Sequence, residues 1–93
     1  MVSANQTGPQ FLADQLERLM ALPLETKDDV QRWYSEAHAV QSEFKRFPSF
    51  EFPHHIWHYF ADADIRQRDL DYCDSQHGKI SEYIAQARAT QSI

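Results

Sequence analysis

The segment from Glu51 to Asp69, EFPHHIWHYFADADIRQRD, looks most like a chemical site, because three histidines and three aspartates lie among its nineteen residues. Two imidazoles one helical turn apart, with a carboxylate one turn further on, can supply three ligands to zinc, nickel or iron. Either Glu51 or His38 could complete such a set. The candidate metal ligands are His54, His55, His58 and Asp62.

The same residues also fit a surface ridge that holds no metal. On a helix the i, i+3, i+4 and i+7 positions share one face. Arg66 falls on that face, where it would pair with the aspartates and repel a cation. No H-E-x-x-H or paired Glu-x-x-His motif accompanies the histidines, so we expect no cofactor and treat a divalent metal as the alternative. The predicted surface ridge is His55, His58, Asp62, Arg66 and Asp69.

Apolar side chains recur at spacings of three and four, the pattern of helices packed along one face. Pro23 and Pro48 each end a helix, since a residue before proline leaves the α region. Thr26 and Asp29 have the spacing of a capping box. After a flexible N-terminus, 1–8, the predicted helices cover about 9–22, 27–46 and 53–89 of one domain, 1–93. Phe50 and Phe52, in the link, are expected to tuck under the core.

The third stripe continues from Ile56 to Ala87, which predicts one long helix with a possible kink near Gly78. The expected fold is therefore all-α: a three-helix antiparallel arrangement with two shorter helices packed on one long C-terminal helix. The alternative is a break at Gln76–Gly78 that folds the chain into a four-helix monomer.

Two short helices cannot cover a helix of this length, so its distal end should stay partly exposed. A symmetric homodimer would bury that end. The predicted interface residues are Ile80, Tyr83, Ile84 and Ala87.

Composition narrows the partners and the compartment. The net charge is −5 and the nine Lys and Arg residues form no basic stripe, so nucleic-acid binding is not expected. Val2 to Gln10 is polar, which predicts no signal peptide and no membrane contact. Cys73 is the single cysteine, which fits the cytoplasm, and its acidic neighbours disfavour a nucleophilic thiolate.

These patterns favour a small, soluble, non-enzymatic helical protein that acts through protein–protein contacts. One alternative is a metal-binding protein that uses the His-His-Asp ridge. The other is an acidic inhibitor or immunity-type protein that grips a basic partner. Its candidate contact residues are Asp62, Asp64, Asp69, Asp71 and Asp74.

Overall fold

A computed structural model describes residues 7–91, and its regular elements are helices, which confirms the all-α prediction. Residues 1–6 of the predicted flexible N-terminus lie outside the described residues, while Thr7 and Gly8 already belong to the start of the first helix. The elements are α1 (Gly8–Met20), α2 (Lys27–Glu43), the short 3₁₀ helix η2 (Phe44–Arg46), α3 (His54–Ala61), α4 (Ala63–Arg68) and α5 (Leu70–Gln91).

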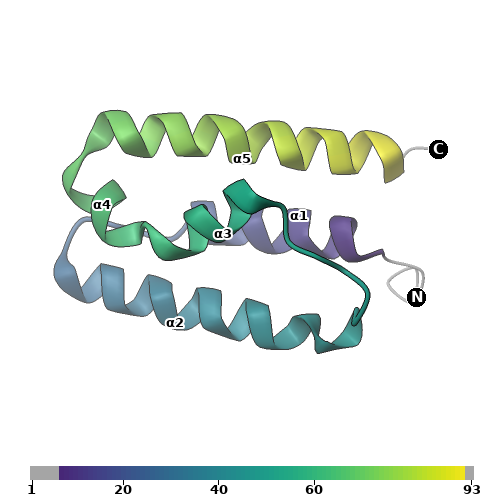
Figure 1. The fold of residues 1–93 in the computed structure, drawn as a ribbon. Coiled ribbons are helices and arrows are strands. Elements are labelled where there is room, and N and C mark those ends of the chain that lie inside the picture. The colour runs from purple at the N-terminus through teal and green to yellow at the C-terminus, as the bar shows by residue number, and fades with distance from the viewer. Residues whose placement is uncertain (1–6, 92–93) are drawn as a thin grey trace.

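Successive passes of the chain run in opposite directions along the long axis of the bundle (Figure 1). α1 and α2 form an antiparallel hairpin, a crossover after η2 leads into α3, and α3 and α4 together run back along the bundle. α5 then returns antiparallel to them and packs most extensively on α1. The chain therefore makes four passes along the bundle, with α3 and α4 sharing the third.

Both helices of the N-terminal hairpin begin at capping boxes. Asp29 donates its backbone N–H to Thr26 Oγ1 at 3.1 Å, and Thr26 N–H donates to Asp29 Oδ2 at 3.1 Å, which confirms the predicted box. A second box links Thr7 and Gln10 at the start of α1. The apolar stripe predicted for α2 is buried at Val30, Trp33, Ala37 and Val40, with Phe44 following in η2.

The crossover carries aromatic rings back against the core, as predicted. The rings of Phe50 and Phe52 lie 5.1 and 4.8 Å from that of Phe44. Phe50 also covers the start of α1, where a Cβ on Gly8 would come within 2.8 Å of Phe50 Cδ1. A side chain at residue 8 would therefore displace the Phe50 ring, which favours glycine there.

The prediction of one continuous helix over 53–89 is wrong. The helix breaks at Asp62 (φ −110°, ψ 20°) and again at Asp69 (φ −135°, ψ 100°). Asp69 caps the next helix, because its Oδ1 accepts the backbone N–H of Tyr72 at 3.1 Å. Gly78 lies inside α5, so neither the predicted kink nor the alternative break at Gln76–Gly78 is found there.

The uncovered distal end, on which the predicted dimer interface depended, is also absent. With the third segment broken, α5 is short enough for α1 to cover its apolar face (Figure 1). Ile80, Ile84 and Ala87 are buried in the core of this one chain, and Tyr83 packs against that core half-buried. These four residues therefore hold α5 to its own bundle.

Candidate functional site

Arg66 does not lie on a surface ridge but points into the core with 1% of its surface exposed. Its guanidinium carbon lies 4.1 Å from the centre of the Tyr59 ring and 4.4 Å from that of Trp33. It donates from Nη1 to the Tyr59 carbonyl oxygen at 2.8 Å. The break at Asp62 changes the phase of the helix and turns Ala63 and Arg66 inward together, so the prediction for Arg66 is wrong.

A chain of hydrogen bonds leads from Arg66 to Asp62. Gln76 accepts from Arg66 at 2.8 Å, and its amide donates to Asp62 Oδ2 at 3.2 Å. Tyr72 donates its hydroxyl to the same carboxylate oxygen at 2.5 Å, and this bond raises the pKa of Tyr72. We call Tyr59, Asp62, Arg66, Tyr72 and Gln76 the buried polar cluster, although Asp62 and Tyr72, at its outer edge, are half-buried. Asp62 therefore holds α5 in place instead of facing a ligand beside the histidines.

Parts of the buried polar cluster lack partners. Within residues 7–91, the Tyr59 hydroxyl and the Nε and Nη2 groups of Arg66 are buried without a hydrogen bond. Burial raises the pKa of Tyr59 to about 12 and lowers the pKa of Arg66. Removal from water disfavours the charged form of each group, tyrosinate or guanidinium. The cluster thus contains unmet hydrogen-bonding capacity at the centre of the bundle.

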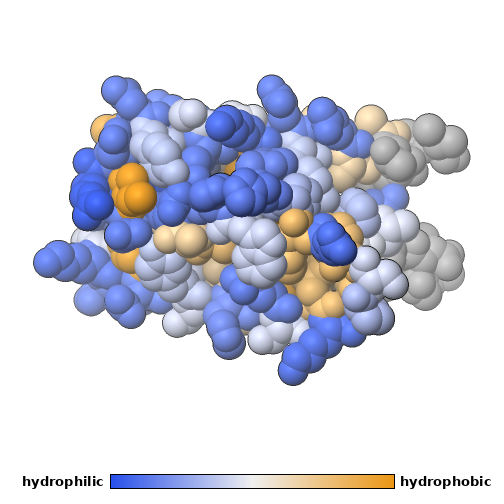
Figure 2. Space-filling model, viewed as in Figure 1, coloured by the Kyte–Doolittle hydropathy of each residue, from blue (hydrophilic) through white to orange (hydrophobic). Residues whose placement is uncertain are grey.

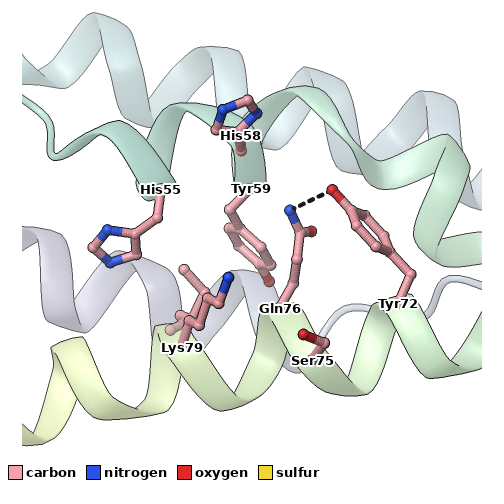
Figure 3. Close-up of a pocket in the computed structure, with 8 residues that line it drawn as sticks. His55, His58, Tyr59, Tyr72, Ser75, Gln76 and Lys79 are labelled. Atoms are coloured by element: carbon pink, nitrogen blue, oxygen red, sulfur yellow. Dashed lines mark hydrogen bonds between the residues drawn. The ribbon is translucent and has the colours of Figure 1, made fainter.

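The three histidines of α3 point in different directions. His54 and His58 approach each other on the outer surface, with 3.0 Å between their Nε2 atoms. His55 is turned toward α5 (Figure 3), and Asp62 is bound to Tyr72 and Gln76. Within the described part of the chain, no group of three or more His, Cys, Asp or Glu residues is placed to hold a metal ion. The predicted ligands are therefore not assembled into one centre.

A hollow lies between α3 and α5, and its volume is about 230 Å³ (Figure 3). His55 and Lys79 also border a neighbouring hollow with Glu82, Tyr83 and Gln86, so a groove continues along α5. We call the first space the α3–α5 hollow. Its walls are His55, His58, Tyr59, Tyr72, Ser75, Gln76, Lys79 and Ile80.

Aromatic side chains also reach the surface around the crossover and α3. Trp57 is 47% exposed, and its ring is 4.8 Å from Phe52 and 6.2 Å from Phe60, edge-on to both. Figure 2 shows a mainly hydrophilic face on which hydrophobic residues gather near the crossover. We call Phe47, Phe50, Phe52 and Trp57 the aromatic patch; the three phenylalanines are half-buried.

The predicted acidic residues do not share one environment. Asp64, Asp69, Asp71 and Asp74 are exposed, whereas Asp62 belongs to the buried polar cluster. The Tyr34 hydroxyl lies 2.8 Å from Asp64 Oδ1, and this hydrogen bond lowers the pKa of Asp64. Asp64 thus also fastens α4 to α2.

The free thiol of Cys73 lies 3.9 Å from His77 Nδ1, half-buried on α5. Burial raises the pKa of the Cys73 thiol, and Asp74 raises it further, while Arg66 acts in the opposite direction. A thiol kept protonated is a poor nucleophile, which agrees with the expectation that the acidic neighbours of Cys73 disfavour a nucleophilic thiolate.

Comparisons with known protein families, curated protein sequences and solved structures return no match for this chain. None of the helices in the described residues is both long and apolar enough to cross a membrane. The function must therefore be inferred from the geometry of the chain's own side chains.

The sequence contained signals for two features that were not singled out. In α3, Trp57 lies off the face that carries Ile56 and Phe60, so its exposure follows from helical periodicity. Lys79 follows Ser75 by four residues and places a cation one turn along from a hydroxyl. Ser75 and Lys79 line the α3–α5 hollow. Sequence spacing alone could not reveal this hollow, because it forms only when the chain turns back at Asp69.

Proposed function

We propose that this protein is non-enzymatic and acts through protein contacts, with the aromatic patch as the contact surface and a second copy of the chain as the partner. The observation that carries the proposal is the exposure of Trp57 in a fixed orientation. Tryptophan is among the commonest residues at the energetic centres of interfaces, because it buries a large apolar area with few rotatable bonds.

The surroundings of Trp57 suit such a contact. Phe52 and Phe60 brace its ring, so little conformational entropy remains to be lost on binding. Arg46 lies at the edge of the patch with its guanidinium carbon 5.5 Å from the centre of the Phe47 ring. Apolar side chains at the centre and charge at the rim are typical of protein interfaces.

We take a second copy as the partner because one aromatic patch can then serve both sides of the contact. Trp57 lies at the middle of the eight-residue α3, with Phe52 on one flank. A two-fold axis near Trp57 would place each aromatic patch against the other, so that one surface serves both subunits. This dimer differs from the one predicted from the sequence, because Ile80, Ile84 and Ala87 belong to the core and Tyr83 packs against it.

Sedimentation velocity from micromolar to hundreds of micromolar tests this proposal. The wild-type chain is expected to dimerise, and Trp57→Ala should weaken the dimer about thirtyfold, which corresponds to the loss of an interface hot spot. Leu70→Ala is the matched control, because Leu70 is an exposed apolar residue, 75% accessible, outside the patch. A wild-type monomer at every concentration, or equal effects of the two substitutions, would contradict the proposal.

The proposal places the protein in the cytoplasm, which the free Cys73 thiol supports. Binding to a basic protein stays a prediction that rests on the exposed Asp64, Asp69, Asp71 and Asp74. It requires salt-sensitive binding that weakens when Asp71 and Asp74 are reversed to lysine.

A further inference from the structure

We propose that the α3–α5 hollow binds a small organic anion, with Lys79, His55 and Ser75 as the residues that hold its carboxylate or phosphate group. This site lies beyond the proposed dimer surface. Trp57 and the hollow occupy different sides of α3, because Trp57 is two residues from His55 and turned toward Phe52. Each proposal can therefore fail without the other.

The first support is the number of free donors on the walls of the hollow: His55 and Lys79 lie at one end, and Ser75 lies beside Gln76 (Figure 3). Among residues 7–91, no hydrogen bond or ion pair engages the side chains of Lys79, His55 or Ser75. In Figure 3, His55 and Lys79 approach from opposite helices, and Ser75 lies one turn before Lys79 on α5. An ammonium, an imidazole N–H and a hydroxyl can all donate to one anionic group.

The second support is the Tyr59 side chain, which lines the hollow and ends in a polar group. Figure 3 shows the Tyr59 side chain directed from α3 toward α5, between Lys79 and Gln76. The hydroxyl is buried and has no hydrogen-bond partner in the described part of the chain, although Tyr59 lines the hollow. Buried polar groups in native proteins are nearly always paired. Because the hydroxyl has no accessible surface, a ligand in the hollow would lie against the Tyr59 ring and would reach the hydroxyl only after the side chain shifted.

The two ends of the hollow set the orientation of the ligand. At the far end, the Asp62 carboxylate lies behind Tyr72 and Gln76, which donate to it at 2.5 and 3.2 Å. Its charge disfavours an anion there, so the anionic group belongs beside Lys79. Tyr59 and Ile80 supply apolar wall between the ends. The volume of about 230 Å³ fits a small molecule rather than a large cofactor.

Glu82 is the acidic residue that opposes binding, since it borders the neighbouring hollow together with His55 and Lys79. Its carboxylate reduces the attraction of the Lys79 end for an anion. Replacement of Glu82 by glutamine should therefore tighten anion binding, whereas loss of Lys79 should weaken it. Opposite effects at two neighbouring positions would identify the end of the hollow that takes the charge.

Amide-shift NMR titrations test the proposal with benzoate, phenyl phosphate and benzylammonium at constant ionic strength. We expect saturable shifts from α3 and α5 with one or both anions, and none with the cation. The two anions distinguish a carboxylate site from a phosphate site. Lys79→Gln should weaken binding about tenfold, and Glu82→Gln should strengthen it.

Lys45→Gln is the matched control, because it removes the same charge from η2, outside the walls of the hollow. Its binding should stay within about twofold of the wild type, since only general electrostatic attraction is lost. Equal weakening by Lys45→Gln and Lys79→Gln, shifts of equal size with benzylammonium, or no saturable shift with either anion would each overturn the proposal. Circular dichroism verifies that the exposed Lys79 can be replaced without loss of helix.

Discussion

The N-terminal hairpin and the C-terminal half of the chain are held together by different interactions. α1 and α2 start at capping boxes and bury mainly apolar side chains. α3 and α4 start without a side-chain cap, and the core between them and α5 contains the buried polar cluster. The hairpin thus has capped helix starts and an apolar core, which are the usual sources of helix stability. The second half has two uncapped helix starts and charged and polar groups in its core. Such departures concentrate where a protein binds or acts.

The largest expected effect tests the buried polar cluster. Arg66→Ala should lower the free energy of unfolding by about 3 to 5 kcal/mol. The change empties the space between Trp33 and Tyr59 and leaves the Tyr59 carbonyl and Gln76 Oε1 without their donor. Urea denaturation followed by circular dichroism measures the loss.

Arg66→Met separates packing from charge in the same position. Methionine fills most of the volume without a buried cation, and replacing buried charges by apolar residues is often neutral. We therefore expect Arg66→Met to cost about 1 kcal/mol or less. If Met and Ala are equally damaging, the hydrogen bonds of Arg66, and not its volume, hold the C-terminal half together.

The next effect lies at the edge of the hairpin. Gly8→Ala should destabilise by about 1 to 3 kcal/mol, because the new methyl would lie 2.8 Å from Phe50 Cδ1 and 3.3 Å from its Cβ. Thermal unfolding monitored by circular dichroism measures it. In a Phe50→Ala background the same substitution should cost little. An equal cost in both backgrounds would show that the ring contact is not the cause.

The sequence determined the hairpin more fully than the second half for a physical reason. Local signals such as the Thr26 and Asp29 pair fix the start of α2, and Pro23 and Pro48 lie in the links beyond the ends of α1 and α2. The ends of α3 and α4 depend on tertiary contacts: burial of Arg66 on Trp33 compensates for the break at Asp62. Periodicity predicts which residues share a face of one unbroken helix. It cannot show that a break in the helix rotates the following residues to a different face. Arg66 was therefore placed on the surface, and α5 was expected to extend beyond its cover.

Gly78 provides the opposite case to Gly8. A Cβ at Gly78 would meet nothing within 4 Å, and the residue lies inside α5. Gly78→Ala should raise the free energy of unfolding by about 0.5 to 1 kcal/mol, since alanine restricts the unfolded chain and favours helix. Urea denaturation gives the change directly. A loss of stability would indicate that the glycine serves a bend or contact that α5 makes in another state.

The smallest effect concerns His77, which lies on the half-buried side of α5. Burial lowers its pKa from the ordinary 6.5, Arg66 acts in the same direction and Asp74 opposes both. The unfolded chain therefore binds the proton more readily than the folded chain, so stability contributed by neutral His77 is lost as pH falls from above 6.5 through the lowered native pKa.

NMR titration of the His77 ring should give a midpoint below 6.5. His77→Gln should reduce the slope of unfolding free energy against pH in that interval. A midpoint at or above 6.5 would mean that His77 is better solvated, or closer to Asp74, than its packing beside Tyr59 implies.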